Sequence, residues 1–129
     1  MRSIKFRAWD KIEKVMINSS EIHWIEFNDN IWLYDYKDKT FGDSSVLILM
    51  QFTGLHDKNG KEIYHFDILK TVDKLYLVDW HFNRWVLKDI NRNMKIFEFN
   101  KIDFEAGFFE KIGDKFSTPE LLENPKSDS

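Results

Sequence analysis

Histidine and aspartate side chains are the residues of this 129-residue chain that could bind a metal ion. His56 and His65 lie in one short stretch, together with Asp57 and Asp67. Imidazole and carboxylate groups ligate zinc and similar ions. However, no HxH or HExxH spacing occurs in the chain. We predict that these four side chains lie in turns and at strand ends, with no metal and no cofactor bound.

Carboxylates and hydroxyls could also act in catalysis. Asp10 and Asp79 flank apolar strands as Asp57 and Asp67 do, and paired carboxylates can exchange protons or hold Mg²⁺. Their spacing brings no two of them together, and aspartate at the start of a turn accepts backbone N–H groups. Thr53 is best interpreted as part of a corner, because no GxSxG or SxxK pattern is present. We expect no catalytic residue and no enzymatic activity.

Aromatic residues provide the clearest indication of binding. Trp80, Phe82 and Trp85 bracket a predicted hairpin tip, and Arg84 lies among them. Small β-barrels bind peptides through exposed aromatic rings and can stack bases on them. Core packing is the alternative for the two tryptophans, whereas Phe82 lies among polar turn residues. These four residues form the predicted binding site, and a second aromatic set comprises Trp32, Tyr34 and Tyr36.

Basic residues near this hairpin define a second hypothesis. If Arg84, Lys88, Arg92 and Lys95 converged beside an exposed aromatic ring, they could bind nucleic acid. The net charge is −3, however, from 19 basic and 22 acidic residues that are well mixed. Nonspecific binding of phosphates needs clustered lysine and arginine. We therefore favour a protein partner and keep nucleic acid as the alternative.

The composition predicts a folded protein. Hydrophobic residues make up 43% of the chain and aromatic residues 16%, which is too apolar for a disordered chain. The absence of cysteine excludes disulfides and thiolate metal sites. The N-terminus lacks an apolar signal region, and the longest apolar run, residues 46–50, is too short to span a membrane. We expect a soluble cytoplasmic protein, and its several strand edges favour a homo-oligomer.

Alternation of apolar and polar residues predicts an all-β fold. The predicted strands are residues 3–9, 15–17, 21–27, 31–36, 46–52, 66–72, 76–80, 85–88, 95–99, 102–104 and 108–112. Asn59-Gly60 suits a type I′ hairpin turn, and Thr118-Pro119 suits the start of a short helix. The polar segment 37–45 predicts a boundary between an N-terminal β extension, residues 1–45, and a domain of residues 46–129.

The central segment contains Met50-Gln51-Phe52-Thr53-Gly54-Leu55, Asp57-Lys58-Asn59-Gly60-Lys61-Glu62-Ile63-Tyr64 and Asp67-Ile68. Through these residues it closely resembles the YopX family of phage and prophage proteins. Further matches are Ile4 to Asp10, Met16-Ile17, Ile112-Gly113 and Pro119-Glu120-Leu121-Leu122. The chain departs from the family at His65-Phe66, where Glu-Gly is usual. Phe66 therefore suggests an ordinary start to the next strand rather than the unusual backbone angle that glycine permits.

What the resemblance implies is mainly architectural. It implies an SH3-type small β-barrel in the C-terminal part, behind an N-terminal β-hairpin extension, with a short C-terminal helix. The resemblance implies no catalytic residues that could be assigned to positions of this chain. The phage setting implies an accessory role in a bacterial host, and we expect a non-enzymatic adaptor that binds a host or phage protein.

Overall fold

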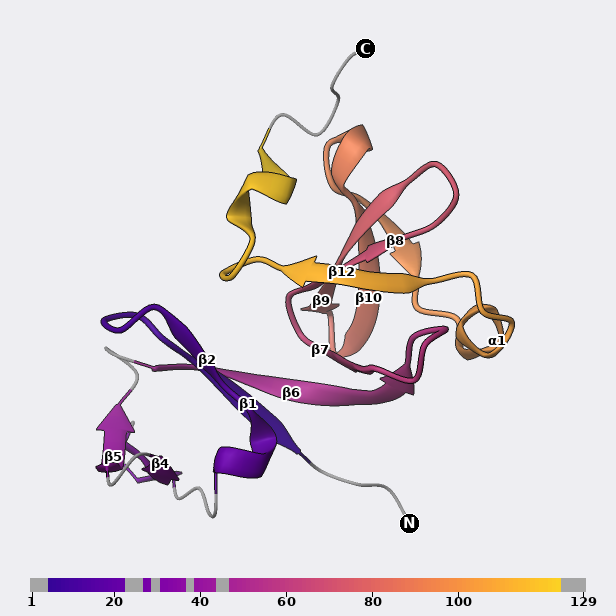
Figure 1. Cartoon of the computed structure of the whole chain (residues 1–129). Coiled ribbons are helices and arrows are strands. Elements are labelled where there is room, and N and C mark those ends of the chain that lie inside the picture. The colour runs from indigo at the N-terminus through magenta and orange to yellow at the C-terminus, as the bar shows by residue number, and fades with distance from the viewer. Residues whose placement is uncertain (1–4, 23–26, 29–30, 37–38, 44–46, 124–129) are drawn as a thin grey trace. The chain divides into compact units, whose positions relative to one another are not determined.

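The chain has an all-β fold with antiparallel sheets and very little helix, as the sequence predicts (Figure 1). The computed structural model describes residues 5–22, 27–28, 31–36, 39–43 and 47–123, and it describes side chains in 5–22 and 47–123. Its contacts divide the chain into two compact units, Met1–Phe52 and Thr53–Ser129. This division falls within a strand, C-terminal to the predicted boundary at residue 45, and the predicted domain organisation stays a prediction.

Unit 1 is built around a short antiparallel sheet. Its principal strands are β1 (Phe6–Asp10), β2 (Val15–Ile17) and the first part of β6 (Leu47–His56). β1 lies between the other two and pairs antiparallel with both. Ala8, Ile17 and Leu47 form its buried cluster. Its remaining elements are η1 (Ser19–Glu21), β3 (Phe27–Asn28), β4 (Ile31–Tyr36) and β5 (Lys39–Asp43).

Unit 2 contains a five-stranded sheet that curls into a half-barrel (Figure 1). The strand order across the sheet is β11-β10-β9-β8-β12. Its strands are β8 (Asp67–Lys70), β9 (Leu75–His81), β10 (Arg84–Asp89), β11 (Lys95–Glu98) and β12 (Glu110–Asp114). The other elements are β7 (Glu62–Tyr64), η2 (Ile90–Arg92), α1 (Lys101–Glu105) and η3 (Pro119–Leu122).

Alternate residues of the five-stranded sheet build two separate buried clusters, because successive side chains of a strand point to opposite faces. Leu69, Val78 and Leu87 belong to the cluster that α1 and the following segment cover with Phe104 and Phe109. On the opposite face, the second cluster comprises Ile68, Leu77 and Ile90, with Leu121 and Leu122 of η3 packed against it. The sheet is therefore buried on both faces, which positions the β9–β10 hairpin rigidly.

Two predicted local structures are wrong. Residues 102–104, predicted as a strand, lie in α1, because the Asn100 side chain accepts a hydrogen bond from the N–H of Ile102 and caps a helical turn. Asn59-Gly60 does not form a type I′ turn, because only Gly60 has positive φ (84°). The loop is instead organised by Asp57, whose carbonyl accepts the Gly60 N–H at 3.0 Å. Before β3, the predicted strand 21–27 lies mostly outside the described residues, and Glu21 belongs to η1.

The prediction of an ordinary strand start at Phe66 is also wrong. Phe66 adopts φ 72°, a left-handed conformation that bulky residues rarely take. Its ring stacks on His65 with centroids 3.7 Å apart and meets Phe116 edge-on at 5.4 Å. The Lys115 ammonium lies 4.6 Å from the centroid of the same ring. The tight turn between β7 and β8 therefore keeps the backbone angle that glycine would allow, and ring contacts hold it.

Candidate functional site

The β9–β10 hairpin ends in a two-residue turn with an unusual sequence. His81 pairs with Arg84 across the hairpin, and Phe82 and Asn83 connect them. Both connecting residues have positive φ, 50° and 64°, which is the pattern of a type I′ turn. Asparagine and glycine tolerate that conformation, but phenylalanine does so only at a cost in strain. The local sequence thus presents an aromatic ring at a position where the backbone disfavours it.

The three aromatic residues of the hairpin differ in exposure. Phe82 is 83% exposed and Trp80 is 49% exposed. Trp85 is half-buried and packs against the core cluster of unit 2. Its ring meets that of Trp80 edge-on, with centroids 4.9 Å apart. Trp85 thus belongs to the core. Trp80 and Phe82 are the exposed aromatic residues of the hairpin, and we call these two residues the hairpin tip; the Phe82 ring lies 4.2 Å from that of His81.

Ion pairs surround Val86 on the other face of the hairpin. Val86 is fully buried, and its cross-strand neighbours are Asp79 and Glu98. Lys88 Nζ lies 2.7 Å from Asp79 Oδ2, and Arg84 lies 3.9 Å from Glu98. This face therefore carries alternating charges rather than a positive surface.

Asp79 joins three segments of unit 2. Its carboxylate lies 2.7 Å from His65 Nε2 and 2.7 Å from Lys88 Nζ, and it accepts the Trp80 N–H at 2.8 Å. Burial alone would raise the pKa of Asp79, but these three hydrogen bonds and the charge of Lys88 outweigh it and lower the pKa below its ordinary value. The carboxylate therefore stays ionised and fixes the β7–β8 turn to the hairpin.

The basic residues of the nucleic-acid hypothesis do not all share one face. Arg84 and Lys88 alternate with Trp85 and point to the face around Val86. Lys95 lies across from Asp89, so it belongs to the opposite face, and its ammonium sits 5.5 Å from the Phe97 ring centroid. The predicted convergence of the four basic residues is therefore not formed by these strands.

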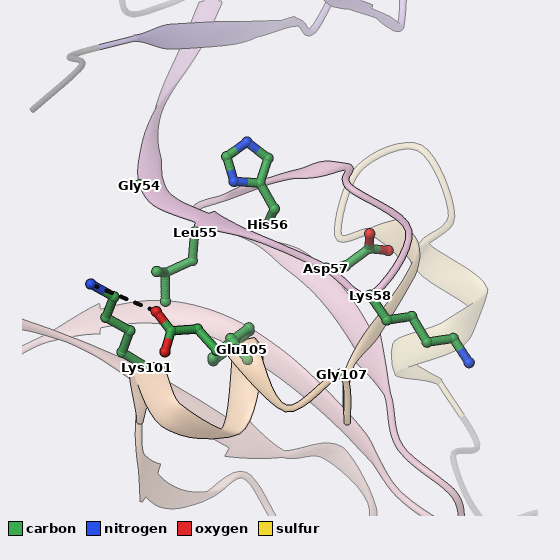
Figure 2. A pocket seen from close by; sticks show the side chains of 9 residues that line it. Gly54, Leu55, His56, Asp57, Lys58, Lys101, Glu105 and Gly107 are labelled. Atoms are coloured by element: carbon green, nitrogen blue, oxygen red, sulfur yellow. Dashed lines mark ion pairs between the residues drawn. The ribbon is translucent and has the colours of Figure 1, made fainter.

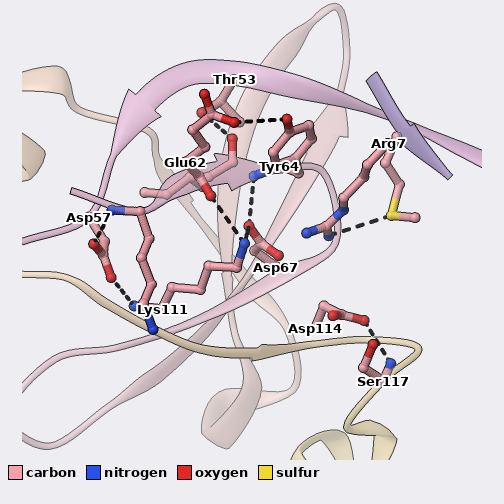
Figure 3. A network of polar contacts seen from close by, with 12 residues as sticks. Arg7, Thr53, Asp57, Glu62, Tyr64, Asp67, Lys111, Asp114 and Ser117 are labelled. Atoms are coloured by element: carbon pink, nitrogen blue, oxygen red, sulfur yellow. Dashed lines mark hydrogen bonds and ion pairs between the residues drawn. The ribbon is translucent and has the colours of Figure 1, made fainter. Parts of the chain in front are cut away.

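The acids considered as metal ligands serve the fold instead (Figure 3). Asp57 accepts the backbone N–H groups of Asn59, Lys61 and Lys111, which outweigh the effect of burial and lower its pKa. Asp67 is fully buried, accepts the Tyr64 N–H and lies 3.2 Å from Lys111 Nζ. Within the described part of the chain, no three metal-binding side chains come together.

The sequence correctly predicts that the Thr53 hydroxyl bonds to the backbone, but Thr53 and Gly54 lie within β6 rather than at a corner between strands. The hydroxyl of Thr53 donates to the carbonyl of Ile63 at 2.8 Å and accepts the N–H of Leu55 at 3.2 Å. The hydroxyl is thus used in backbone hydrogen bonds. The second aromatic set, Trp32, Tyr34 and Tyr36, has side chains outside the described residues.

Sequence reasoning missed a pocket of about 390 Å³ in unit 2 (Figure 2). One wall is residues 54–58, at the end of β6 and the start of the following turn, and the other is residues 101–107, which include α1. The first wall lies in the segment that carries the family resemblance. Since the second wall lies more than forty residues away in the sequence and its residues 102–104 were predicted as strand, no sequence signal joined the two.

Comparisons with known proteins identify a family and a similar solved structure. The family model described as YopX protein matches residues 5–123. A solved structure, the crystal structure of protein EF1440 from Enterococcus faecalis, is similar with a TM-score of 0.70 and 25% sequence identity. The alignment covers 95% of this chain and 100% of that one. No curated protein matches the chain. Across the described residues, no helix has the length and apolar character needed to cross a membrane.

Proposed function

The chain belongs to the YopX protein family, and we propose that it is a phage or prophage accessory protein that binds another protein without catalysing a reaction. Its contact surface is the hairpin tip, with Phe82 and Trp80 as the contacting rings. Trp85 supports Trp80 from the core, and Arg84, which follows the turn on the other face of the hairpin, is the fourth residue of the proposed site. The partner is a host or phage protein in the bacterial cytoplasm.

The observation that carries the proposal is the exposed ring of Phe82. It is 83% exposed at a position with φ 50°. A phenylalanine there is unfavourable twice, because it strains the backbone and exposes apolar surface. Residues that strain the backbone or expose apolar surface without a gain in stability are typical of functional sites. Aromatic residues, phenylalanine included, are also enriched at protein interfaces.

We further propose that unit 2 is an SH3-type barrel. Four consecutive strands, β8 to β11, form a meander, a helical turn follows, and β12 returns to pair with β8. This order and the single turn before the last strand support the assignment. A β-barrel of this type commonly carries its binding residues on the loops between strands.

The alternative, a nucleic-acid-binding accessory factor, has weaker support. Lys88 is engaged by Asp79 and Arg84 lies beside Glu98. Lys88 would have to leave Asp79, 2.7 Å away, before it bound a phosphate, whereas the Arg84–Glu98 pair is long and exposed and holds Arg84 only weakly. Self-association through the hairpin tip is a further form of protein binding, and the experiment below distinguishes it.

Site-specific photocrosslinking tests the proposal. A photoreactive phenylalanine replaces Phe82 in one variant and Val72 in a matched control. Val72 is 98% exposed, in the segment that joins β8 and β9, so it is at least as accessible as Phe82. Both variants are irradiated in lysate of a phage-carrying bacterial host, with and without nuclease, and adducts are identified by mass spectrometry.

A protein adduct that forms from position 82 and not from position 72 is expected. An adduct with the chain itself would assign the tip to self-association. Equal adducts from both positions, or adducts that disappear with nuclease, would overturn the protein-binding proposal.

A further inference from the structure

The two edges of the five-stranded sheet differ in how their backbone groups are used. At one edge, the loop at Asp57 closes β12. The Asp57 carboxylate accepts the Lys111 N–H at 2.8 Å, and the next N–H, of Lys58, donates to the carbonyl of Phe109 at 2.9 Å. A register shift between Lys111 and Gly113 also interrupts β12. Such irregularities and bonded loops keep a further strand from adding to a sheet edge.

The opposite edge, β11, is open. Among the described residues, β11 pairs with β10 alone, in an unbroken register from Lys95 to Glu98. No other described segment bonds to the backbone of residues 95–98. The strand contains neither a proline nor a bulge. Its outer N–H and C=O groups can therefore pair with one more strand.

The apolar side chains of β11 also suit an added strand. Ile96 is 38% exposed on one face of the sheet, and Phe97 is half-buried on the other. Successive side chains of an added strand would pack against them, one on each face. Extended segments that bind to sheet edges gain affinity from the backbone and specificity from such side-chain contacts.

The charged side chains at the two ends of β11 are available to a partner. The Lys95 ammonium lies 5.5 Å from the Phe97 ring centroid and forms no ion pair with a described residue. Glu98 is 82% exposed, and its pair with Arg84 is 3.9 Å long, so that pair contributes little. Because opposite charges directly across two strands stabilise their pairing, an added strand gains from an acid opposite Lys95 and a base opposite Glu98.

A second copy of this chain cannot supply this pattern by pairing the same edge. A two-fold axis normal to the sheet would relate the two copies, and directly opposite side chains of antiparallel strands lie on the same face. Each residue would therefore face one that lies an even number of positions away. Lys95 and Glu98 are three positions apart, so they cannot lie opposite each other in a self-paired edge. The charges thus favour a different chain.

We propose that β11 binds an extended segment of the partner protein as an added antiparallel strand. The segment carries a base opposite Glu98, an acid opposite Lys95 and apolar residues between them. It is antiparallel because every strand pair of this sheet is antiparallel. The inference rests on the proposed function, since the segment belongs to the partner that the hairpin tip contacts. Arg84 lies beside Glu98, so a strand along this edge runs on toward the hairpin.

Titration of the full chain with short peptides, followed by ¹H–¹⁵N NMR, tests the proposal. The matched probe is acetyl-Thr-Lys-Val-Val-Glu-Thr-amide, and the control probe exchanges its lysine and glutamate. Saturable shifts of the amides of residues 95–98 are expected with the matched probe, which should bind about fivefold more tightly than the control. N-methylation of both valines removes one N–H from each edge of the probe and should abolish binding.

Charge-swapped variants locate the binding. Lys95→Glu combined with Glu98→Lys should reverse the preference between the two peptides. Lys101→Glu combined with Glu105→Lys swaps an exposed ion pair on α1 and should leave the preference unchanged. The NMR spectra report that each variant is folded.

Four results would overturn the proposal. They are equal affinity for the two peptides, an unchanged preference in the Lys95 and Glu98 variant, full binding of the N-methylated probe, and the absence of saturable shifts. Shifts of residues 95–98 that depend on the concentration of the chain alone would assign the edge to a second copy instead. The peptides do not require Phe82, so failure of this titration and failure of the photocrosslinking experiment are distinguishable.

Discussion

The ring of Trp85 meets the ring of Trp80 edge-on, with the centroids 4.9 Å apart. This contact joins the exposed hairpin tip to the interior of unit 2. From Trp85 a series of ring contacts continues through Phe99 at 6.4 Å to Phe104 and then Phe109. Trp80 is thus half-exposed on a support that cannot easily move, and the arrangement suits a preformed binding surface better than a flexible one.

The two tryptophans should contribute unequally to stability. Trp85→Ala leaves a cavity against the core cluster and should lower the free energy of unfolding by about 3 kcal/mol. Trp80→Ala removes the edge-on pair but little buried area, so the loss should be about 1 kcal/mol. Urea unfolding monitored by circular dichroism measures both. Equal losses would show that Trp80 is as much a core residue as Trp85.

A turn sequence suited to the backbone should stabilise the hairpin. Phe82→Asn combined with Asn83→Gly places Asn-Gly at the two left-handed positions, and the free energy of unfolding should rise by about 1 kcal/mol. If the hairpin tip is the contact surface, the same variant should lose its partner in the crosslinked or co-purified complex. A variant that is more stable and still binds normally would remove Phe82 from the contact surface.

At position 66, glycine should give a more stable protein than alanine, which is the reverse of their usual order. Both substitutions remove the ring contacts with His65, Phe116 and Lys115 and should destabilise the protein. Alanine keeps the strain of a left-handed residue, whereas glycine relieves it. Phe66→Gly should therefore be more stable than Phe66→Ala by about 1 kcal/mol. Thermal and urea unfolding of the pair test this, and a more stable alanine variant would contradict the left-handed turn.

Gly113 should not tolerate a side chain. A Cβ there would overlap the hydroxyl of Thr118 and press against Leu121 at 3.1 Å. That hydroxyl accepts the Asp114 N–H and donates to the Asp114 carbonyl, so it cannot move freely. Gly113→Ala should lower the free energy of unfolding by about 2 kcal/mol.

A double-mutant cycle with Thr118→Ala tests the cause of this loss. The double variant should lose less than the sum of the two single variants, because removal of the hydroxyl relieves part of the overlap. If the losses in unfolding free energy of the two single variants simply add, the destabilisation by Gly113→Ala does not come from overlap with the Thr118 hydroxyl.

Acid should weaken unit 2 through Asp79 and Asp57. The pKa of each is lower in the folded protein than the ordinary value of about 3.9. Their contribution is fully present above that ordinary pKa and is lost as the pH falls through the lower folded value. Unfolding free energies between about pH 6 and about pH 3 should therefore decline at the acid end. Asp79→Asn should reduce this decline without abolishing it, since Asp57 remains. An unchanged decline would show that Asp79 has no stabilising partners.

The sequence by itself determined the class of fold and the family. Alternating apolar residues predict the strands that pair as β1, β2, β9 and β10, because alternation along a strand depends only on which face is buried. Turn chemistry predicted that the Thr53 and Asp57 side chains accept backbone N–H groups, since a short polar side chain bonds to groups a few residues on. These features need no information about distant parts of the chain.

Only the tertiary structure decided which aromatic residues are exposed and where a pocket lies. Trp80 and Trp85 look alike in the sequence, and their different burial follows from the segments packed against each. Phe66 and Phe82 occupy left-handed positions against their own preference, because contacts in the folded chain fix the backbone there. The pocket joins residues 54–58 to α1, which lie far apart in the chain. The physical reason is common to all three cases: local propensities are worth about 1 kcal/mol or less, and packing between distant segments overrides them.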